Sequence, residues 1–306
     1  MTAPGIPNEF VLSTSCFGTR LRTIEDQAFA AVAMGFRKIE MGQADTPPTL
    51  NGFADSHRET GIRVTSVVSG CLKPSTERPA CQLLSSSNAE EREQAIGSVR
   101  RHMQLAQKML APVVVLRGSS VADTKLRQEA ETLNVELHRD GLSEELAEKI
   151  RDYVHRVQKK GQRQLEHLCR SLHQLLTELP QTKLAIEPGL HIDDLLSFEA
   201  MGWVLDDLQG KGIGYWHDVG RIHMRQKSGL PGQGQWLEAY GGRMVGIHLQ
   251  DAADNEYQMP PGTGEVDFRL VGEYTPKTAL KVLEIDQKHG RTEILGAVQF
   301  LNGKGF

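Results

Sequence analysis

Four side chains of types that bind divalent metal ions each stand at the end of a short apolar segment in the second half of the chain. They are Glu187 in LAIEPG, Asp218 in GIGYWHDVG, His248 in MVGIHLQD and Glu284 in LKVLEID. Carboxylate oxygens and imidazole nitrogens are common metal ligands, and the same groups transfer protons in general acid–base catalysis. Because these residues lie far apart in the sequence, they can act together only if the fold brings several strand ends to one place.

Short apolar segments alternate with amphipathic helical segments along the chain, which is typical of parallel strands joined by crossover helices. The predicted strands are Phe10–Cys16, Arg37–Met41, Arg63–Ser69, Val113–Arg117, Lys183–Glu187, Gly212–His217, Met244–Leu249 and Leu280–Ile285. No GxGxxG turn follows the first strand, which argues against an open doubly wound sheet. We therefore predict a single (β/α)8 TIM barrel over residues 1–306, with its active site at the C-terminal ends of the strands.

The predicted units are unequal in length. Residues 121–160, between the fourth and fifth strands, are rich in charge and predict a helical insertion ahead of a crossover helix, Gln162–Leu179. A lid, a contact in a homo-oligomer and a solvated surface extension all remain open for this insertion. The clearest of the other helices are Ala89–Leu110 and Ile192–Leu208.

Strand alternation predicts that the four candidate ligands share one direction. Every second side chain of a strand faces the same way. If the ligands face the barrel axis, so do Ala185, Gly214, Trp216, Gly246 and Val282. The opposite phase then holds large apolar residues that would pack under the helices: Leu184, Ile186, Ile213, Tyr215, Val245, Ile247, Leu283 and Ile285. His217 adjoins Asp218, so we expect its side chain outside the metal site.

Three carboxylates cannot share a partly dry site without compensating charge, because like charges raise one another's pKa values. One bound divalent cation would supply that charge. The oxygen-rich ligand set favours Mn²⁺, Mg²⁺ or Co²⁺, and Zn²⁺ is also compatible with it.

Composition narrows the class of protein. The formal net charge of −4 disfavours a nucleic-acid partner, which usually meets a basic face. We expect no membrane partner, since no apolar run is long enough to span a bilayer and no secretory signal is visible at the N-terminus. The four cysteines are scattered without a CxxC pair, which is typical of reduced thiols in a cytoplasmic protein.

These motifs together resemble the xylose-isomerase-like TIM barrel superfamily, which contains sugar phosphate isomerases and epimerases and the endonuclease IV type of DNA repair enzyme. The resemblance covers most of the chain. It rests on the strand-end residues Glu187, Asp218 and Glu284, on IHLQD (247–251) and on the glycine-rich segment PGTGEVDF (261–268).

The resemblance implies a metal ion bound by Glu187, Asp218, His248 and Glu284, and a small sugar or sugar-derived substrate. The ion would stabilise an enediolate while the catalytic residues Glu187 and Glu284 take and return a proton. That chemistry isomerises or epimerises a keto-sugar, a sugar phosphate or a hydroxy acid. Residues expected to bind the substrate are Glu40, Arg117, Trp216, Arg221 and His223. Arg221 stands where members of the family often carry a histidine, and it suits a carboxylate or phosphate.

Two alternatives remain open. An endonuclease IV-like phosphodiesterase acting on damaged DNA would need further histidines near strands two to four, and the nearest, His57 and His102, lie in helical segments. A sugar-acid dehydratase, or a barrel that only binds its ligand, would use the same metal site without isomerising anything.

Overall fold

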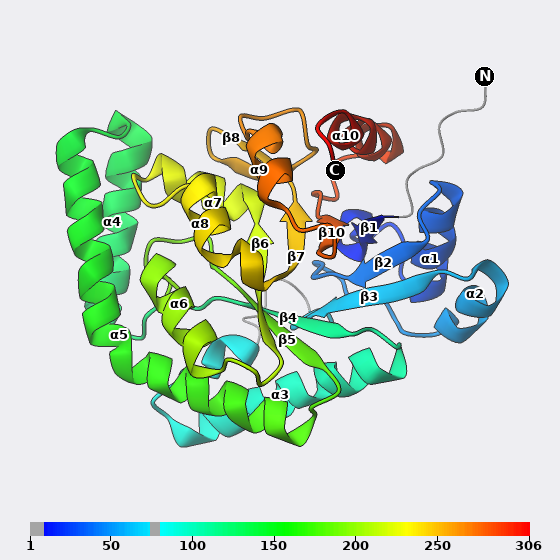
Figure 1. The fold of residues 1–306 in the computed structure, drawn as a ribbon, viewed down its shortest axis with the longest axis horizontal. Coiled ribbons are helices and arrows are strands. Elements are labelled where there is room, and N and C mark those ends of the chain that lie inside the picture. Colours follow the sequence, from blue (N-terminus) through cyan, green and yellow to red (C-terminus); the bar gives the residue numbers. More distant parts are fainter. Residues whose placement is uncertain (1–8, 74–79) are drawn as a thin grey trace.

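Short runs rich in valine, isoleucine and leucine form a closed parallel barrel in the computed structural model, which describes residues 9–73 and 80–306 (Figure 1). The strands follow the order β1–β10–β7–β6–β5–β4–β3–β2 around the barrel. Their bounds are β1 Phe10–Ser13, β2 Lys38–Met41, β3 Arg63–Val68, β4 Val113–Arg117, β5 Lys183–Glu187, β6 Ile213–Asp218, β7 Met244–Leu249 and β10 Leu280–Leu283. The predicted TIM barrel is confirmed.

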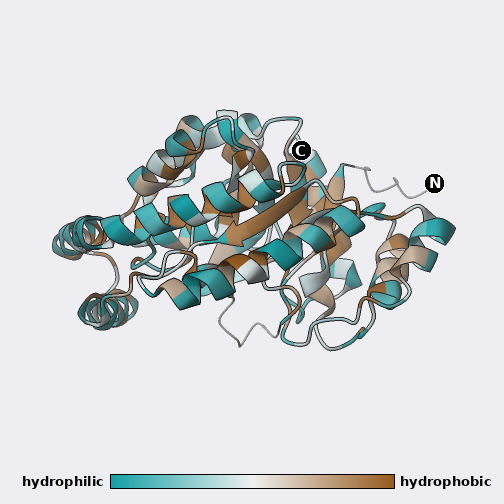
Figure 2. Ribbon diagram, turned by 90° about the horizontal axis from the view of Figure 1, so that it is seen from below, coloured by the Kyte–Doolittle hydropathy of each residue, from teal (hydrophilic) through white to brown (hydrophobic). Residues whose placement is uncertain are grey.

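Helices connect the strands and cover the barrel. They are α1 Ile24–Ala33, α2 Phe53–Thr60, α3 Ala89–Lys108, α4 Thr124–Asp140, α5 Glu144–Glu178, α6 Phe198–Asp207, α7 Val219–Lys227, α8 Gln233–Tyr240, α9 Phe268–Tyr274 and α10 Arg291–Gly303. Short 3₁₀ turns occupy Thr14–Phe17, Ala80–Leu83 and Gly241–Arg243, and a small antiparallel hairpin, β8 Asp251–Ala253 with β9 Glu256–Met259, follows β7. The barrel strands are hydrophobic and the outer faces of the helices are hydrophilic (Figure 2).

Several predicted boundaries were wrong, and three of them concern the barrel mouth. The first strand ends at Ser13 rather than Cys16, because residues 14–17 form a 3₁₀ turn. The last barrel strand ends at Leu283, so Glu284 lies just beyond it. The helix predicted from Ile192 begins only at Phe198, where the Ser197 hydroxyl accepts the N–H of Ala200.

The predicted insertion and the crossover helix are not separate. Residues 121–160 contain α4, but α5 runs from Glu144 to Glu178 through the boundary expected near Lys160. A single buried stripe continues along α5, and the Tyr153 hydroxyl ties it to α4 by donating to Leu126 O at 2.9 Å. The helix changes direction along its length, first beside α4 and then along the barrel (Figure 1). We call α4 and the first part of α5, up to Lys160, the helical hairpin.

Two hydrophobic cores lie on the two sides of the barrel wall. The inner one contains Val11, Val68, Val113, Val115, Ala185, Trp216 and Val282, which confirms the predicted inward phase of Ala185, Trp216 and Val282. The large residues predicted to face outward lie in or against the outer core, with one exception. Val245 packs against the inner core instead, because the register of β6 and β7 shifts between Tyr215 and Trp216.

Trp216 fills the barrel interior because Gly246 on the neighbouring strand leaves room for its ring. A Cβ at Gly246 would lie 2.3 Å from Trp216 Cζ3, and Trp216 is fully buried. We expect Gly246→Ala to lower the free energy of unfolding by about 1–3 kcal/mol, the usual cost of overpacking a core. Urea denaturation measures this.

Gly296, inside α10, is the matched control, because no atom lies within 4 Å of a Cβ built there. Gly296→Ala should leave stability unchanged or raise it by up to about 1 kcal/mol. Equal denaturation midpoints for the two variants would contradict the packing argument.

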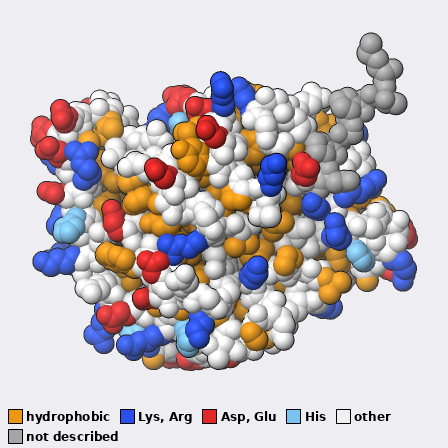
Figure 3. Space-filling model, in the orientation of Figure 1, with side chains coloured by type: hydrophobic (Ala, Val, Ile, Leu, Met, Phe, Trp, Pro, Cys, Tyr) orange, Lys and Arg blue, Asp and Glu red, His pale blue; other side chains and the backbone are white. Residues whose placement is uncertain are grey.

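Within the described ranges no helix is both long and apolar enough to cross a bilayer. On the face drawn in Figure 3, Lys and Arg side chains are interspersed with Asp and Glu.

Candidate active site

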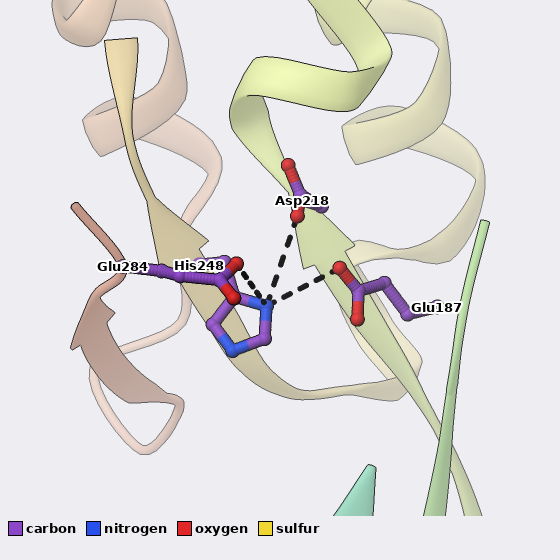
Figure 4. A group of neighbouring side chains, drawn as sticks. All are labelled: Glu187, Asp218, His248 and Glu284. Carbon is purple, nitrogen blue, oxygen red and sulfur yellow. Dashed lines mark hydrogen bonds and ion pairs between the residues drawn. The ribbon is translucent and has the colours of Figure 1, made fainter. Parts of the chain in front are cut away.

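Glu187, Asp218, His248 and Glu284 converge at the C-terminal ends of β5, β6, β7 and β10. One ligand atom from each lies within 4.8 Å of all the others, and all four side chains are buried. His248 Nδ1 is 3.2 Å from Glu187 Oε1, 3.6 Å from Glu284 Oε2 and 3.8 Å from Asp218 Oδ2. Figure 4 shows the four side chains pointing toward one another.

The barrel register positions these groups. Asp218 and His248 are Cα partners across β6 and β7, and Glu187 is the last residue of β5. Val282 of β10 also pairs with His248, so Glu284, two residues further on, projects from the same face just above it. The sequence-based expectation that these four side chains share one side of the barrel wall therefore holds.

The arrangement fits one divalent cation. Bonds of about 2.1 Å to such an ion place neighbouring ligand atoms about 3 Å apart and opposite ones about 4.2 Å apart. The distances between His248 Nδ1 and the three carboxylates fall in that range. Three oxygens and one nitrogen form a donor set suited to Mn²⁺, Mg²⁺ or Co²⁺, and also to Zn²⁺.

Glu40 holds the other ring nitrogen of His248. His248 Nε2 lies 3.0 and 3.2 Å from the two carboxylate oxygens of Glu40, and Ser66 donates to Glu40 Oε2 at 2.7 Å. A carboxylate on the far nitrogen is the usual way that a metal-binding histidine is oriented. This corrects the expectation that Glu40 binds substrate, because its buried carboxylate is already engaged beneath the site.

Two arginines also lie among the carboxylates. Arg117 donates through Nε to Glu187 Oε2 at 3.3 Å, and its Nη2 donates to Glu284 Oε1. Arg221 Nε is 3.2 Å from Asp218 Oδ2 and 3.6 Å from Glu187 Oε1. Two largely buried guanidinium groups therefore compensate part of the acidic charge that the sequence analysis assigned to a metal ion.

Arg117 contacts one carboxylate oxygen of each of two glutamates. It contacts Glu187 Oε2 and Glu284 Oε1, whereas His248 Nδ1 faces the other oxygen of each carboxylate. Each glutamate thus has one oxygen directed at the candidate metal position and one directed at the arginine. Gln43 Oε1 accepts from Arg117 Nη1 at 3.1 Å and helps to fix the guanidinium.

Gln250 is a site residue that the sequence reasoning missed. Its Nε2 donates to Asp218 Oδ1 and Oδ2 at 2.9 and 2.8 Å and to Glu284 Oε2 at 3.2 Å. Its carbonyl oxygen accepts from the N–H of Gln258. Strand alternation could have predicted this residue, because Gln250 stands two residues after His248 and so faces the same side.

The charges of the cluster set the protonation of its carboxylates. Burial raises the pKa of Glu187, but the guanidinium groups of Arg221 and Arg117 outweigh it and hold this pKa well below its usual range. Burial and the neighbouring Glu187 charge raise the pKa of Asp218 well above its usual range. A proton in the cluster therefore resides on Asp218 rather than on Glu187.

The imidazole carries a second proton. Burial lowers the pKa of His248, but the charges of Glu40, Glu284 and Glu187 outweigh this and raise its pKa well above the usual value. These directions favour protons on Asp218 and on His248 before a metal ion binds.

A cavity of about 490 Å³ adjoins the cluster, and we call it the metal-side cavity. The four candidate ligands do not line it; Arg117 and Arg221, which contact their carboxylates, do. Its described wall includes Arg117 and Arg221 but not Trp216 or His223. Trp216 is fully buried in the inner core, 5.0 Å below the His248 ring, and His223 lies 3.5 Å from Glu265. The structure therefore gives no support to the expectations that Trp216 and His223 contact substrate, and both stay predictions.

His217 points away from the cluster, as alternation predicts. It lies between the Tyr215 hydroxyl and Gln233 Oε1, at 2.8 and 2.7 Å. Burial lowers its pKa to about 4, so this imidazole is neutral.

Asp194 is a second missed residue on the cavity wall. It sits in the loop after β5, where its Oδ1 accepts the N–H of Leu196 at 2.7 Å, and burial raises its pKa to about 6. Gly118 and Gly189 make room for it, because a Cβ at either would lie within 2.4 Å of Asp194 Oδ2. The sequence placed this residue in a helix and so concealed it.

Asp251 organises the glycine-rich segment that follows the hairpin. Its carboxylate accepts the N–H groups of Gly262, Gly264 and Val266 at 2.8, 2.9 and 3.1 Å. The last residue of the IHLQD motif is thus a structural anchor for the loop, not a metal ligand.

A family model described as xylose isomerase-like TIM barrel matches residues 28–272. The chain therefore belongs to the xylose isomerase-like TIM barrel family. A search of curated proteins finds no match.

Solved structures with the same fold have low sequence identity. A 3-keto-D-glucoside 4-epimerase from E. coli has 14% identity and a TM-score of 0.64, with 96% of this chain and 99% of that chain covered. D-psicose 3-epimerase from Clostridium cellulolyticum H10, solved with D-tagatose, has 12% identity and a TM-score of 0.67, with 97% and 99% covered. The IOLI protein, solved with a zinc atom, has 11% identity and a TM-score of 0.58, with 97% and 96% covered.

Proposed function

We propose that the protein is a divalent-metal-dependent isomerase or epimerase of a small keto-sugar, sugar phosphate or hydroxy acid. The observation that carries this proposal is the group of four ligand atoms at four strand ends, within 4.8 Å of one another and contacted by Arg117 and Arg221, which line the metal-side cavity. Structures of the same fold include sugar epimerases, which supports the same class of reaction.

Glu187, Asp218, His248 and Glu284 would hold the metal ion, which when bound makes a C–H beside a carbonyl more acidic. Glu187 Oε2 and Glu284 Oε1, the oxygens directed away from the metal position, are placed to take the proton and return it. Return to a neighbouring carbon gives isomerisation, and return to the opposite face of the same carbon gives epimerisation.

Arg117 must release these two oxygens before either can accept a proton from carbon. We propose that it turns to an oxygen of the substrate, such as a carboxylate, a phosphate or a hydroxyl, as the substrate enters. Arg221, which also lines the metal-side cavity, is the second candidate for binding an anionic group.

The test combines metal analysis with isotope exchange. The purified protein should bind one equivalent of Mn²⁺ or Co²⁺, and in heavy water it should incorporate deuterium into one member of a panel of keto-sugars. A sugar converted without solvent label would exclude proton transfer through Glu187 and Glu284. A protein that binds no divalent ion would exclude the metal mechanism.

Metal affinity should rise steeply with pH. The raised pKa values of Asp218 and His248 mean that both bind protons that the ion must displace. Because each bound ion displaces two protons, the affinity for the metal ion increases by up to about a hundredfold per pH unit, as long as the pH is below both pKa values. Calorimetry in buffers of different ionisation enthalpy measures the protons released, and affinity that does not change between pH 6 and 8 would contradict this protonation scheme.

No observation favours the phosphodiesterase alternative. His57 Nδ1 contacts Ile62 O at 2.6 Å, and His102 contacts Gly70 N and Ser98 O, so both histidines are engaged by backbone away from the cluster. The face drawn in Figure 3 carries mixed charges and not the basic surface that usually meets DNA. Manganese as the native metal, a homo-oligomeric assembly and a cytoplasmic location are further parts of the proposal.

A further inference from the structure

A second cavity, of about 580 Å³, lies beside the metal-side cavity. The two share Leu190, His191 and Tyr257 in their walls and so adjoin one another, and we call the pair the groove. We call the second one the hairpin cavity, because the helical hairpin supplies one of its walls. Figure 1 shows the hairpin at one side of the barrel.

The helical hairpin forms one wall of this groove. Leu137 of α4 and Leu142 of the connection to α5 both line the hairpin cavity. Leu142 Cδ2 also lies close to Gly229 at the end of α7, 3.5 Å from where a Cβ would be. The hairpin therefore extends the groove beyond the barrel mouth.

The lining of the hairpin cavity combines apolar and polar surface. Leu137, Leu142, Ile192 and Met224 provide apolar surface, and Asn134 and Asn255 provide amides, beside His138, His191, Asp254 and Lys227. Lys227 is paired with Glu265 at 3.1 Å. Apolar surface beside a few polar groups is the usual composition of a site that binds a sugar or aromatic ring.

We infer that the substrate is a glycoside whose sugar ring carries the reacting ketone, with that sugar in the metal-side cavity and its aglycone ring in the hairpin cavity. This inference rests on the proposed function for the identity of the reacting half. The adjacency of the two cavities supports it, because a free monosaccharide would occupy the metal-side cavity and leave the hairpin cavity to water.

The experiment uses matched pairs of ligands and the full-length protein with Mn²⁺. Methyl and 4-nitrophenyl β-glycosides are compared by calorimetry in the gluco, galacto, manno and xylo series. In at least one series the nitrophenyl glycoside should bind tenfold or more tightly than the methyl glycoside. Leu142→Arg and Leu137→Arg, at partly exposed positions of the hairpin, should each bring that ratio close to one.

Val135→Arg is the matched control, since Val135 lies on α4, is 62% exposed and does not line the cavity. It should keep the wild-type ratio. Equal binding within every pair, no binding of any pair, or a ratio that survives both leucine variants would overturn the inference. Because binding is measured without turnover, failure of deuterium exchange would overturn the proposed reaction and leave this result standing.

Discussion

Replacing Glu187 with glutamine is expected to lower kcat for proton exchange about a thousandfold, within the range that general acid–base groups contribute. Glu284→Gln should have a loss of the same order. In each variant an amide replaces the carboxylate, so the oxygen that Arg117 now contacts can no longer act as the proton acceptor. The amide keeps one oxygen that can bind the ion. Deuterium exchange is therefore measured at saturating Mn²⁺, with metal content determined on the same samples.

Glu256→Gln is the control for this pair. Glu256 lies on β9, is exposed and forms an ion pair with Lys288 at 2.8 Å. Its replacement should change kcat by less than about twofold, as a surface ion pair contributes little. If both site variants kept wild-type exchange rates with metal bound, the two-glutamate mechanism would be wrong.

Arg117→Met is expected to change metal binding and turnover in opposite directions. Removing a buried positive charge beside Glu187 and Glu284 should tighten Mn²⁺ binding at least about fivefold, because charge interactions near 4 Å reach about 4 kcal/mol at an effective dielectric constant of 20. Losing the proposed contact to substrate should lower kcat/KM about a hundredfold or more. Calorimetry and exchange kinetics on one preparation measure both.

Arg139→Met, at an exposed arginine of α4, is a control for loss of charge alone. It should leave both quantities at wild-type values. Weaker metal binding in Arg117→Met would show that Arg117 supports the carboxylate geometry more than it competes with the cation. If kcat/KM of Arg117→Met were undiminished, the proposed contact between Arg117 and the substrate would be wrong.

The strand ends could be predicted because their signal is local. Glu187, Asp218, His248 and Glu284 each close an apolar segment, and alternation along each strand gives the side chain a direction. Parallel strands in a closed barrel then bring the ends together without further information. The same alternation fails at Val245, because a register shift between two strands leaves no local mark.

The partners of these residues could not be predicted in the same way. Glu40 lies on β2, and its contact with His248 crosses the barrel between strands distant in sequence. Arg117 was visible as a cation at a strand end, but only the structure shows that it contacts two glutamates. Asp194 was concealed because its segment has a helix-like pattern, whereas Ser197 starts the helix after it.

Gly161 in α5 bears on how barrels of this kind diversify. A Cβ there would lie 2.5 Å from Leu195 Cδ2, so Leu195 packs directly against the backbone of α5 at this glycine. Leu195 belongs to the same loop as Asp194. The part of α5 after this glycine packs against the barrel, and the part before it belongs to the hairpin. Adding or removing whole turns at the start of this one helix would lengthen or shorten the groove and leave the strand ends untouched. A lineage could thus exchange one size of ligand for another by ordinary insertions and deletions, without rebuilding its reactive centre.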